Sequence, residues 1–277
     1  MEDISIKTRA EESIRGEFHS RLFEPFTKAC KRYRLIADGD RIAVCISGGK
    51  DSMLMAKLFQ EIKKHRKADF DLVFLVMDPG YDSENRTLIE KNARSLDIPV
   101  TVFESNVFEE TDKASKGNCY ICARQRRGHL YAKAKELGCN KIALGHHYDD
   151  VIETILMGML YGGQIGTMMP KLRSRHYEGM ELIRPMYLIR EEDIVAWKDY
   201  NGLEFLRCAC RFAKEDLTDE GDVSSSKRLE IKKLIAELRK VNPSVEANIF
   251  RSVENVDLKT VIEYKKDGER INFLDDY

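Results

Sequence analysis

Short apolar runs alternate with amphipathic segments between residues 41 and 161, and this alternation constrains the fold more than any other feature. The runs at 41–46, 72–77, 100–103 and 141–144 are typical of buried strands, and helical spacing follows each of them. Such alternation indicates βαβ units, in which helices cover both faces of a parallel sheet. We therefore predict an α/β fold whose ligands bind outside the carboxyl ends of the strands.

The length of the chain fits one α/β domain with helical additions. It has 277 residues, of which 43% are hydrophobic, enough for a sizeable core. Residues 12–33 have helical apolar spacing, as do 227–241 and 245–255. We predict an N-terminal helical extension over 1–36, the α/β domain over 37–221 and a C-terminal helical region over 222–277.

Charge and cysteine content narrow the class of protein. The formal net charge is −1, so no global basic field indicates a nucleic-acid partner, although net charge hides a local basic patch. No apolar run approaches the ~20 residues of a membrane helix, and the first residues do not resemble a signal peptide. We predict a cytoplasmic protein with no membrane partner. Seven cysteines, an odd number, argue against a disulfide framework.

The sequence SGGKDS follows the first predicted strand and precedes a predicted helix. Two glycines let backbone N–H groups approach an anion closely, and a helix start directs its dipole at the same point. We predict nucleotide binding, although a tight turn is the simpler alternative. The spacing excludes both a Walker A loop and a dinucleotide fingerprint. The predicted ATP-binding residues of this loop are Ser47, Gly48, Gly49, Lys50, Asp51 and Ser52.

Asp51 is unusual in a loop that holds phosphate, and it suits either a magnesium ligand or the helix N-cap. Three residues at later strand ends, Met77, Gly145 and Asp149, are predicted to join the ATP pocket. Asp149 and its neighbour Asp150 would bind Mg²⁺ or orient the activated base. The alternative for both acids is helix capping.

Two basic features lie near the same predicted edge. Arg126, one helical turn past Cys122, would reach the phosphates unless it lies on a solvated helix face. His146 and His147 are adjacent, and neighbouring side chains on extended backbone point opposite ways, so both are not expected to bind one metal ion. We predict that one of the two forms a hydrogen bond at the nucleotide pocket.

Two groups of cysteines are candidate metal ligands. Cys119 and Cys122 form a C-x-x-C pair before a helix, and Cys208 and Cys210 lie much later. Thiolates that converge in a cytosolic protein indicate zinc or an iron–sulfur cluster, whereas the alternative is ordinary buried thiols. A thioredoxin-like motif is disfavoured because the phosphate loop already follows the first strand. The remaining cysteines are expected to pack in the interior: Cys30, Cys45 and Cys139.

A linked series of motifs makes the resemblance to one family specific. The series consists of SGGKDS at 47–52, CYICARQRRG at 119–128, KIALGHHYDD at 141–150, YGG at 161–163, MPKL at 169–172, IRP at 183–185 and REEDI at 190–194. Over roughly 41–210 it resembles the tRNA 2-thiocytidine synthetase (TtcA) family of PP-loop ATP pyrophosphatases. The segment 242–255 resembles that family's C-terminal helix.

This resemblance implies a HUP-like fold and an ATP-dependent tRNA sulfurtransferase that forms AMP and pyrophosphate. The enzyme would use Mg-ATP to adenylate the C2 oxygen of a cytidine and would replace that oxygen with sulfur. The sulfur would come from a cysteine desulfurase or from sulfide, and the chain would form a homodimer. The implied catalytic residues are Asp51, Arg126, Asp150, Cys119, Cys122 and Cys208.

The resemblance also implies a [4Fe-4S] cluster held by three cysteines. Cys119 and Cys122 match the family's pair, and the flanking motifs place Cys208 at the third position. The usual Pro-Cys-Asn-x-x-Cys setting is replaced here by FLRCACRF, so Cys210 is an alternative third ligand.

Basic clusters at 124–127, 171–175 and 227–228 would contact tRNA phosphates, and Tyr120 and Tyr161 would stack on a flipped base. Two other functions stay open. One is a PP-loop sulfurtransferase for another tRNA base or a small molecule, and the other is a non-catalytic nucleotide-binding redox sensor. The tRNA-lysidine synthetases match less well, because they do not need this cysteine set.

Overall fold

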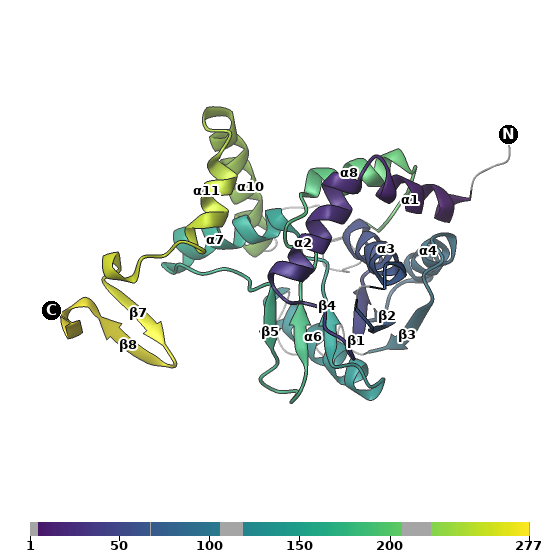
Figure 1. Ribbon diagram of the computed structural model, residues 1–277, viewed down its shortest axis with the longest axis horizontal. Helices are drawn as coiled ribbons and strands as arrows, with labels where there is room; N and C mark the ends of the chain where they lie inside the picture. Colours follow the sequence, from purple (N-terminus) through teal and green to yellow (C-terminus); the bar gives the residue numbers. More distant parts are fainter. Residues whose placement is uncertain (1–4, 67, 106–118, 207–222, 277) are drawn as a thin grey trace. The chain divides into compact units, whose positions relative to one another are not determined.

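The computed structural model describes residues 5–66, 68–105, 119–206 and 223–276 (Figure 1). The side chains of 119–123, 223–226 and 276 lie outside this description. The chain divides into two compact units, Met1–Val151 with Met169–Ser226, and Ile152–Met168 with Lys227–Tyr277. The predicted boundaries at 36/37 and 221/222 stay predictions.

The first unit contains a six-stranded sheet in the order β3-β2-β1-β4-β6-β5. Every neighbouring pair is parallel except β5 and β6, which are antiparallel. The predicted α/β fold is therefore confirmed. Sequence periodicity missed β5 (KLR) and β6 (ELI), because neither forms a continuous apolar run such as the one that contains the equally short β4. The strands are β1 (Arg41–Ile46), β2 (Asp71–Asp78), β3 (Val100–Glu104), β4 (Lys141–Ala143), β5 (Lys171–Arg173) and β6 (Glu181–Ile183).

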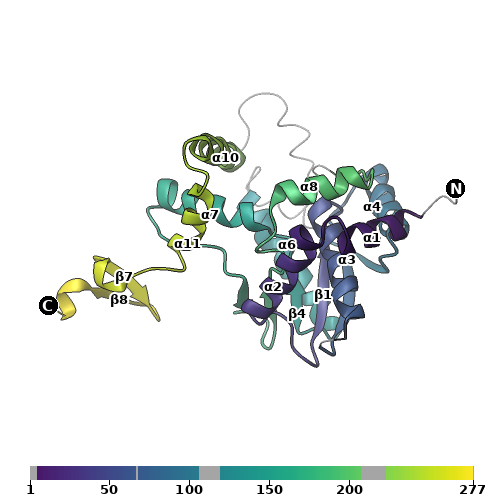
Figure 2. The ribbon, with the colours of Figure 1, turned by 45° about the horizontal axis from the view of Figure 1, so that its top comes forward.

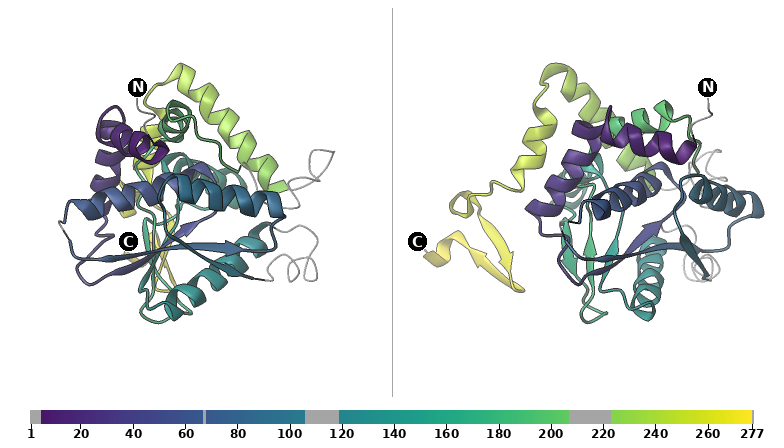
Figure 3. Two further views of the ribbon diagram at one scale, coloured as in Figure 1. Left: turned by 90° about the vertical axis from the view of Figure 1, so that its right-hand side faces the viewer. Right: turned by 45° about the vertical axis from the view of Figure 1, so that its right-hand side comes forward.

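Helices cover both faces of this sheet, as Figure 3 shows. The helices α3 (Lys50–Lys64) and α4 (Ser83–Ser95) lie on one face, and α6 (Cys119–Glu136) lies on the other. Because side chains alternate along a strand, Ile42 and Val44 of β1 join the core under α3 and α4, whereas Ala43 joins the core with Tyr131 and Ala134 of α6. β1 is therefore buried on both sides, as its continuous apolar run predicts.

The order of the strands places a switch point beside β1. The chain moves from β1 to β2 and β3 on one side, and α6 then returns it to β4 on the other side of β1. Folds of this kind bind ligands at the carboxyl ends of the strands beside such a switch point. Since α6 runs back from the carboxyl edge to the amino edge, its first residue, Cys119, lies at the carboxyl edge of the sheet.

The N-terminal segment differs from the single helix expected over 12–33. It forms α1 (Ile6–Arg15), a π-helical turn (His19–Phe23) and α2 (Glu24–Arg32). α1 begins early because the hydroxyl of Ser5 accepts a hydrogen bond from the backbone N–H of Thr8. It ends where Gly16 leaves the helical conformation. These helices lie beside α8 (Glu191–Tyr200), which was not predicted (Figure 2).

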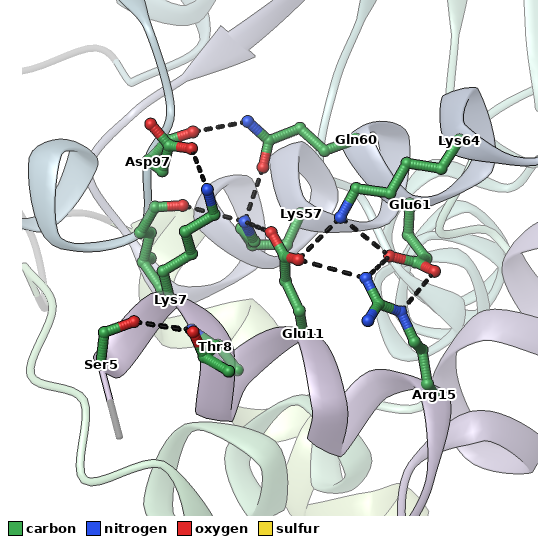
Figure 4. A network of polar contacts seen from close by, with 12 residues as sticks. Ser5, Lys7, Thr8, Glu11, Arg15, Lys57, Gln60, Glu61, Lys64 and Asp97 are labelled. Carbon is green, nitrogen blue, oxygen red and sulfur yellow. Dashed lines mark hydrogen bonds and ion pairs between the residues drawn. The ribbon is translucent and has the colours of Figure 1, made fainter. Parts of the chain in front are cut away.

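An ion cluster joins α1 to the C-terminal half of α3 (Figure 4). The side chain of Lys57 is fully buried, and its ammonium donates to Glu11 at 2.8 Å, to Gln60 at 2.7 Å and to the carbonyl of Leu96 at 2.9 Å. Arg15 pairs with both Glu11 and Glu61, and Lys64 bridges the same two acids. We call this group, Glu11, Arg15, Lys57, Glu61 and Lys64, the α1–α3 ion cluster.

The second unit contains the C-terminal part of α7 (Tyr148–Gly162), α10 (Val223–Val241) and α11 (Val245–Ser252), which the helical spacing anticipated. A hairpin of β7 (Glu263–Lys266) and β8 (Glu269–Asn272) follows. This hairpin was not predicted, although Asp267-Gly268 is a sequence signal for one, and both residues have positive φ, as a type I′ turn requires. Across the described parts of the chain, no helix is long and apolar enough to cross a membrane.

Candidate nucleotide-binding site

The loop after β1 is held in shape by its two serines. The hydroxyl of Ser52 accepts from the backbone N–H of Ser47 at 3.1 Å and donates to the carbonyl of Gly49 at 3.0 Å. The two hydroxyls lie 3.2 Å apart. Gly49 is the N-cap of α3, so the helix begins at Lys50 and not at Asp51. The N-cap alternative for Asp51 is therefore wrong, because the loop reaches helical geometry two residues earlier.

Glycine is required at Gly48 for two reasons. Its φ of +85° lies in the left-handed region, and a Cβ there would stand 2.5 Å from a side-chain carbon of Ile89. The carbonyl of Gly48 also accepts from the backbone N–H of Leu206 at 3.3 Å. The segment that precedes Cys208 is thus attached to the loop. Asn92 of α4 fixes the same segment through the carbonyl of Glu204, at 2.8 Å.

The first turn of α3 follows the carboxyl end of β1 and has no side-chain cap. The first N–H groups of a helix have no partner within the helix itself. Aligned peptide dipoles add a partial positive charge at this end. A loop with close backbone approach and a helix start together form a cradle for phosphate.

Charged side chains flank this cradle. The ammonium of Lys50 lies 3.1 Å from Asp51 Oδ1 and 3.1 Å from Glu191 Oε1. Burial lowers the pKa of Lys50, but the two carboxylates more than offset it, and the pKa lies above its ordinary value. Asp51 Oδ1 is buried, and the cation that it faces is the ammonium of Lys50. A buried carboxylate oxygen at a phosphate loop also suits a metal cation.

The loop after β4 packs directly on the start of α3. A Cβ on Gly145 would lie 3.3 Å from the backbone nitrogen of Ser52 and 3.4 Å from the carbonyl carbon of Asp51. Such a contact is tighter than most side chains tolerate, so glycine lets the two loops meet. The structure therefore brings Gly145 together with the phosphate loop, from across the switch point.

Asp149 and Asp150 fix helix ends beside this contact. Asp150 Oδ2 accepts from the backbone N–H of His147 at 3.0 Å, which caps α7. Asp149 Oδ2 accepts from the N–H of Glu191 at 2.7 Å and thereby caps α8, while its other oxygen pairs with Arg190 at 3.2 Å. These contacts are those of helix-capping acids, the alternative given for both residues. The predicted roles of Asp149 and Asp150 in binding Mg²⁺ or orienting the base stay predictions.

The carboxyl end of β2 forms a third side of the candidate site, after the loops that follow β1 and β4. Met77 is buried at this strand end. Asp78 is also buried, and its Oδ1 accepts from the N–H groups of Gly80 and Tyr81 at 2.9 and 2.8 Å. Arg126 of α6 donates to the hydroxyl of Tyr81 at 3.5 Å, which places it at the same edge of the sheet. Its predicted contact with phosphate stays a prediction.

The two histidines point to different partners. The side chain of His147 is nearly buried, with Nε2 3.5 Å from Asp150 Oδ2. Nδ1 of His146 accepts from Nε of Arg184 at 3.3 Å. Sequence reasoning assigned no role to Arg184 or to Glu191, although both lie in motifs of the series. Nothing in their spacing shows that they meet residues of the β1 and β4 loops.

The cysteines divide into those with a described environment and those without. Cys30, Cys45 and Cys139 are buried and free, as expected for packing residues. Burial raises the pKa of Cys45 to about 12, so this thiol stays protonated. Cys119 and Cys122 lie in the first turn of α6, but their side chains fall outside the description. Cys208 and Cys210 lie outside the described residues.

Internal partners are present for three of the residues expected to contact tRNA. Lys171 pairs with Glu181 at 2.9 Å in the first unit. In the second unit, Arg228 pairs with the buried Glu153 at 3.4 Å, and the hydroxyl of Tyr161 donates to Glu230 at 2.6 Å. Their roles toward RNA stay predictions.

A parallel sheet with a Ser-Gly-Gly cradle at its switch point defines a class of ATP-using proteins. The PP-loop domain family matches this chain over residues 18–209. The U34-tRNA thiolase NcsA from Methanococcus maripaludis, solved with its [4Fe-4S] cluster, has the same fold. Its TM-score is 0.65 at 21% identity, over 84% of this chain and 79% of that one.

Curated relatives are more similar in sequence. A tRNA-cytidine(32) 2-sulfurtransferase from Anaeromyxobacter dehalogenans (strain 2CP-C) is 35% identical over 239 residues, which cover 85% of this chain and 79% of the relative. The protein of that name from Coxiella burnetii (strain CbuG_Q212) is 36% identical over 86% of this chain and 90% of its own. The chain therefore belongs to the tRNA-cytidine(32) 2-sulfurtransferase (TtcA) family of PP-loop proteins, as the motif series indicated.

Proposed function

We propose that this protein is an ATP-dependent tRNA sulfurtransferase that converts a tRNA cytidine to 2-thiocytidine. The observation that carries the proposal is membership of a family of that name over most of the chain, together with the Ser-Gly-Gly loop and uncapped helix start at the switch point. The fold places the loop, the β4 turn and the start of α6 at one edge of the sheet. An activating loop and a set of thiols would have little use together in a simple binding protein.

The cradle would hold the β- and γ-phosphates of ATP during activation. The C2 oxygen of cytidine attacks the α-phosphorus, the bond from that phosphorus to the bridging oxygen breaks, and pyrophosphate leaves. The N–H groups at the start of α3 and the Lys50 ammonium stabilise the charge of the departing group. Hydrosulfide then adds to C2, and AMP leaves with the original oxygen, so the exchange needs no net oxidant. Asp51, through its buried Oδ1, is the residue that suits Mg²⁺.

Three thiolates would hold a [4Fe-4S] cluster, whose open iron supplies a binding point for the incoming sulfur. Cys119 and Cys122 are three residues apart in the first turn of α6. Leu206, the last described residue before Cys208 in the sequence, donates its backbone N–H to the carbonyl of Gly48. This contact of the described chain with the phosphate loop supports the choice of Cys208, or Cys210, as the third ligand.

Nucleoside analysis of tRNA from a strain that lacks the gene tests the reaction. We expect 2-thiocytidine to disappear and to return with the wild-type gene but not with Cys119→Ala. Anaerobic reconstitution of the purified protein should give a brown protein whose cluster absorption is lost in Cys119→Ala. If 2-thiocytidine is unchanged in the deletion strain, the cytidine assignment is wrong. Without cluster absorption in the reconstituted wild-type protein, the sulfur-transfer mechanism fails.

A further inference from the structure

A cavity of about 1140 Å³ lies between α2, the π-helical turn before it and the C-terminal end of α3. Phe26 of α2 and Phe59 of α3 pack edge to face at 5.3 Å, which fixes the two helices against each other. Small-molecule sites usually have volumes of about 300–1,000 Å³, so the space admits a nucleotide. Because α3 runs back from the carboxyl edge of the sheet, its C-terminal end is about 22 Å along the helix from the phosphate loop. The cavity is therefore separate from the candidate nucleotide-binding site.

Three adjacent aromatic rings line this cavity. The ring of Phe23 lies 5.6 Å from that of His19 and 5.2 Å from that of His65, measured between centroids. Glu61 lies 3.7 Å from Nε2 of His65, and a side chain that is 47% exposed keeps part of the ring open to solvent. His19 and Phe23 belong to a π-helical turn, a rare element that often occurs at functional sites. An exposed aromatic surface of this kind is a platform for an unpaired base.

Two exposed lysines line the same cavity. Lys28 and Lys31 are three residues apart on α2, so their side chains are neighbours on one helix face. Within the described part of the chain, neither lysine forms an ion pair or a side-chain hydrogen bond. Arg32, a third lining cation, lies over the ring of Tyr33. Since Glu24 is the one acid among the described lining residues, the cavity has an excess of positive charge.

This arrangement differs from the basic clusters at 171–175 and 227–228. Lys171 and Arg228 have carboxylate partners at 2.9 and 3.4 Å, so a phosphate would have to displace an acid from each of them. No described acid pairs with Lys28 or Lys31, and a phosphate binds there without that loss. Of these basic groups, the two lysines of the cavity are thus the better complement to a polyanion.

We propose that this cavity, which we call the α2–α3 pocket, binds an unpaired nucleotide of the tRNA. The base stacks on the exposed ring of His65, and the flanking phosphates contact Lys28 and Lys31. This inference rests on the function proposed above, which supplies the tRNA. Aromatic stacking combined with lysine–phosphate contacts is the chemistry by which proteins hold single-stranded RNA. The pocket contributes affinity at the amino edge of the sheet and does not touch the reacting cytidine.

Fluorescence anisotropy of labelled tRNA with the full-length protein tests the two lysines. The tRNA is purified from a strain that lacks the gene. Lys28→Gln combined with Lys31→Gln should raise the Kd about 10-fold at low salt. It should also lower the slope of log affinity against log salt by about 1.4, the value for two phosphates of a single strand.

A second double variant is the control for charge. Lys91→Gln combined with Lys135→Gln removes two exposed lysines, on α4 and α6, that do not line the pocket. We expect this variant to change the Kd by less than about 2-fold, because distant exposed charges are screened. Equal Kd values and salt slopes for the two double variants would show that Lys28 and Lys31 contact no phosphate, which overturns the proposal.

A matched pair of substitutions at His65 tests the stacking. His65→Phe keeps an aromatic ring, whereas His65→Ala removes it and leaves both lysines in place. We expect the Kd for tRNA to rise about 10-fold in His65→Ala and to stay within about 3-fold in His65→Phe. Thermal unfolding scans of both variants check that the fold is intact. Equal affinities of the two variants would contradict the stacking.

Turnover separates the pocket from the reaction. In the Lys28→Gln and Lys31→Gln double variant, the KM for tRNA should rise with the Kd, while kcat stays within about 2-fold. A wild-type protein that binds tRNA through the pocket but forms no 2-thiocytidine contradicts the proposed function alone. Formation of 2-thiocytidine with unchanged tRNA affinity in all pocket variants contradicts the pocket alone. If AMP binds to a second site that this double variant lacks, while tRNA affinity is unchanged, the pocket binds free nucleotides and the tRNA assignment is wrong.

Discussion

In its C-terminal half, helix α3 carries Lys57, a fully buried ammonium with three partners, whereas its first turn presents N–H groups with no side-chain cap. The same helix therefore has a part with a buried charge and three partners, which we call its closed end, and a start without a side-chain cap, which we call its open end. The contacts of the buried charge orient α1 against α3. The N–H groups at a helix start are what an anion requires.

The largest effect is expected from Gly48→Ala, which tests the open end. The added Cβ meets Ile89 at 2.5 Å in a left-handed conformation, so the loop must shift. A displacement of catalytic groups by about 1 Å can lower a reaction rate on the order of 100-fold. We therefore expect the rate of pyrophosphate release to fall by at least that factor. The measurement is tRNA-dependent pyrophosphate release at saturating ATP.

Gly39→Ala is the matched control for this substitution. Gly39 also has positive φ, at +80°, but nothing lies within 4 Å of its missing Cβ. We expect the free energy of unfolding of Gly39→Ala to fall by about 1 kcal/mol and its activity to stay at the wild-type level. Equal activity of the two variants would show that the close packing of the loop is irrelevant to function.

Lys57→Met tests the closed end. Methionine fills the space but leaves the carbonyl of Leu96 without its donor and the α1–α3 ion cluster without its buried cation. We expect the free energy of unfolding to fall by about 2 kcal/mol in urea titrations, with little change in ATP affinity below the transition. Lys63→Met, on an exposed pair with Asp71, should change stability by less than about 0.5 kcal/mol. A loss of ATP affinity in stable Lys57→Met would contradict the division between the two ends.

Acid should weaken the ion cluster through Glu11. Burial alone would raise the pKa of Glu11, but Lys57 and Lys64 outweigh it and lower the pKa to about 2. A depressed pKa contributes stability above the unfolded value, and this contribution disappears as pH falls from about 4.5 toward 2. At pH 7, Glu11→Gln should be about 1 kcal/mol less stable than wild type, after allowance for solvent screening.

In thermal unfolding scans, the difference in stability between wild type and Glu11→Gln should shrink steadily below pH 4.5. Glu12→Gln, an exposed neighbour on the same helix, serves as the control and should show no such convergence. A gap between wild type and Glu11→Gln that stays constant down to pH 3 would mean that the carboxylate charge of Glu11 contributes nothing.

The smallest effect concerns Glu191, which competes with phosphate for Lys50. Its carboxylate lies 3.1 Å from the ammonium, and an exchange of partners is expected when ATP binds. Glu191→Gln should lower the KM for ATP by about 2-fold to 3-fold, the size expected for one partly exposed ion pair. Glu192→Gln, the exposed next residue, should leave KM unchanged. A rise in KM for Glu191→Gln would show that Glu191 orients Lys50 instead of competing for it.

Prediction from sequence succeeded where the signal was local and long enough. The run RIAVCI indicated a strand buried on both faces, and β1 is such a strand. It failed for β5, β6 and α8, of which the two strands have only three residues each. The expected helix over 12–33 merged α1 with α2 because both bury residues at helical spacing, although Gly16 and the π-helical turn His19–Phe23 separate them.

The sequence by itself determined the phosphate loop, the parallel α/β pattern and the family, since each depends on neighbouring residues or on motifs in fixed order. The tertiary structure decided which charges meet: Lys50 with Glu191, 141 residues away, and His146 with Arg184, 38 residues away. The physical reason is that burial and pairing depend on how the loops after β1, β4 and β6 converge. The spacing of residues along the chain contains no record of that convergence.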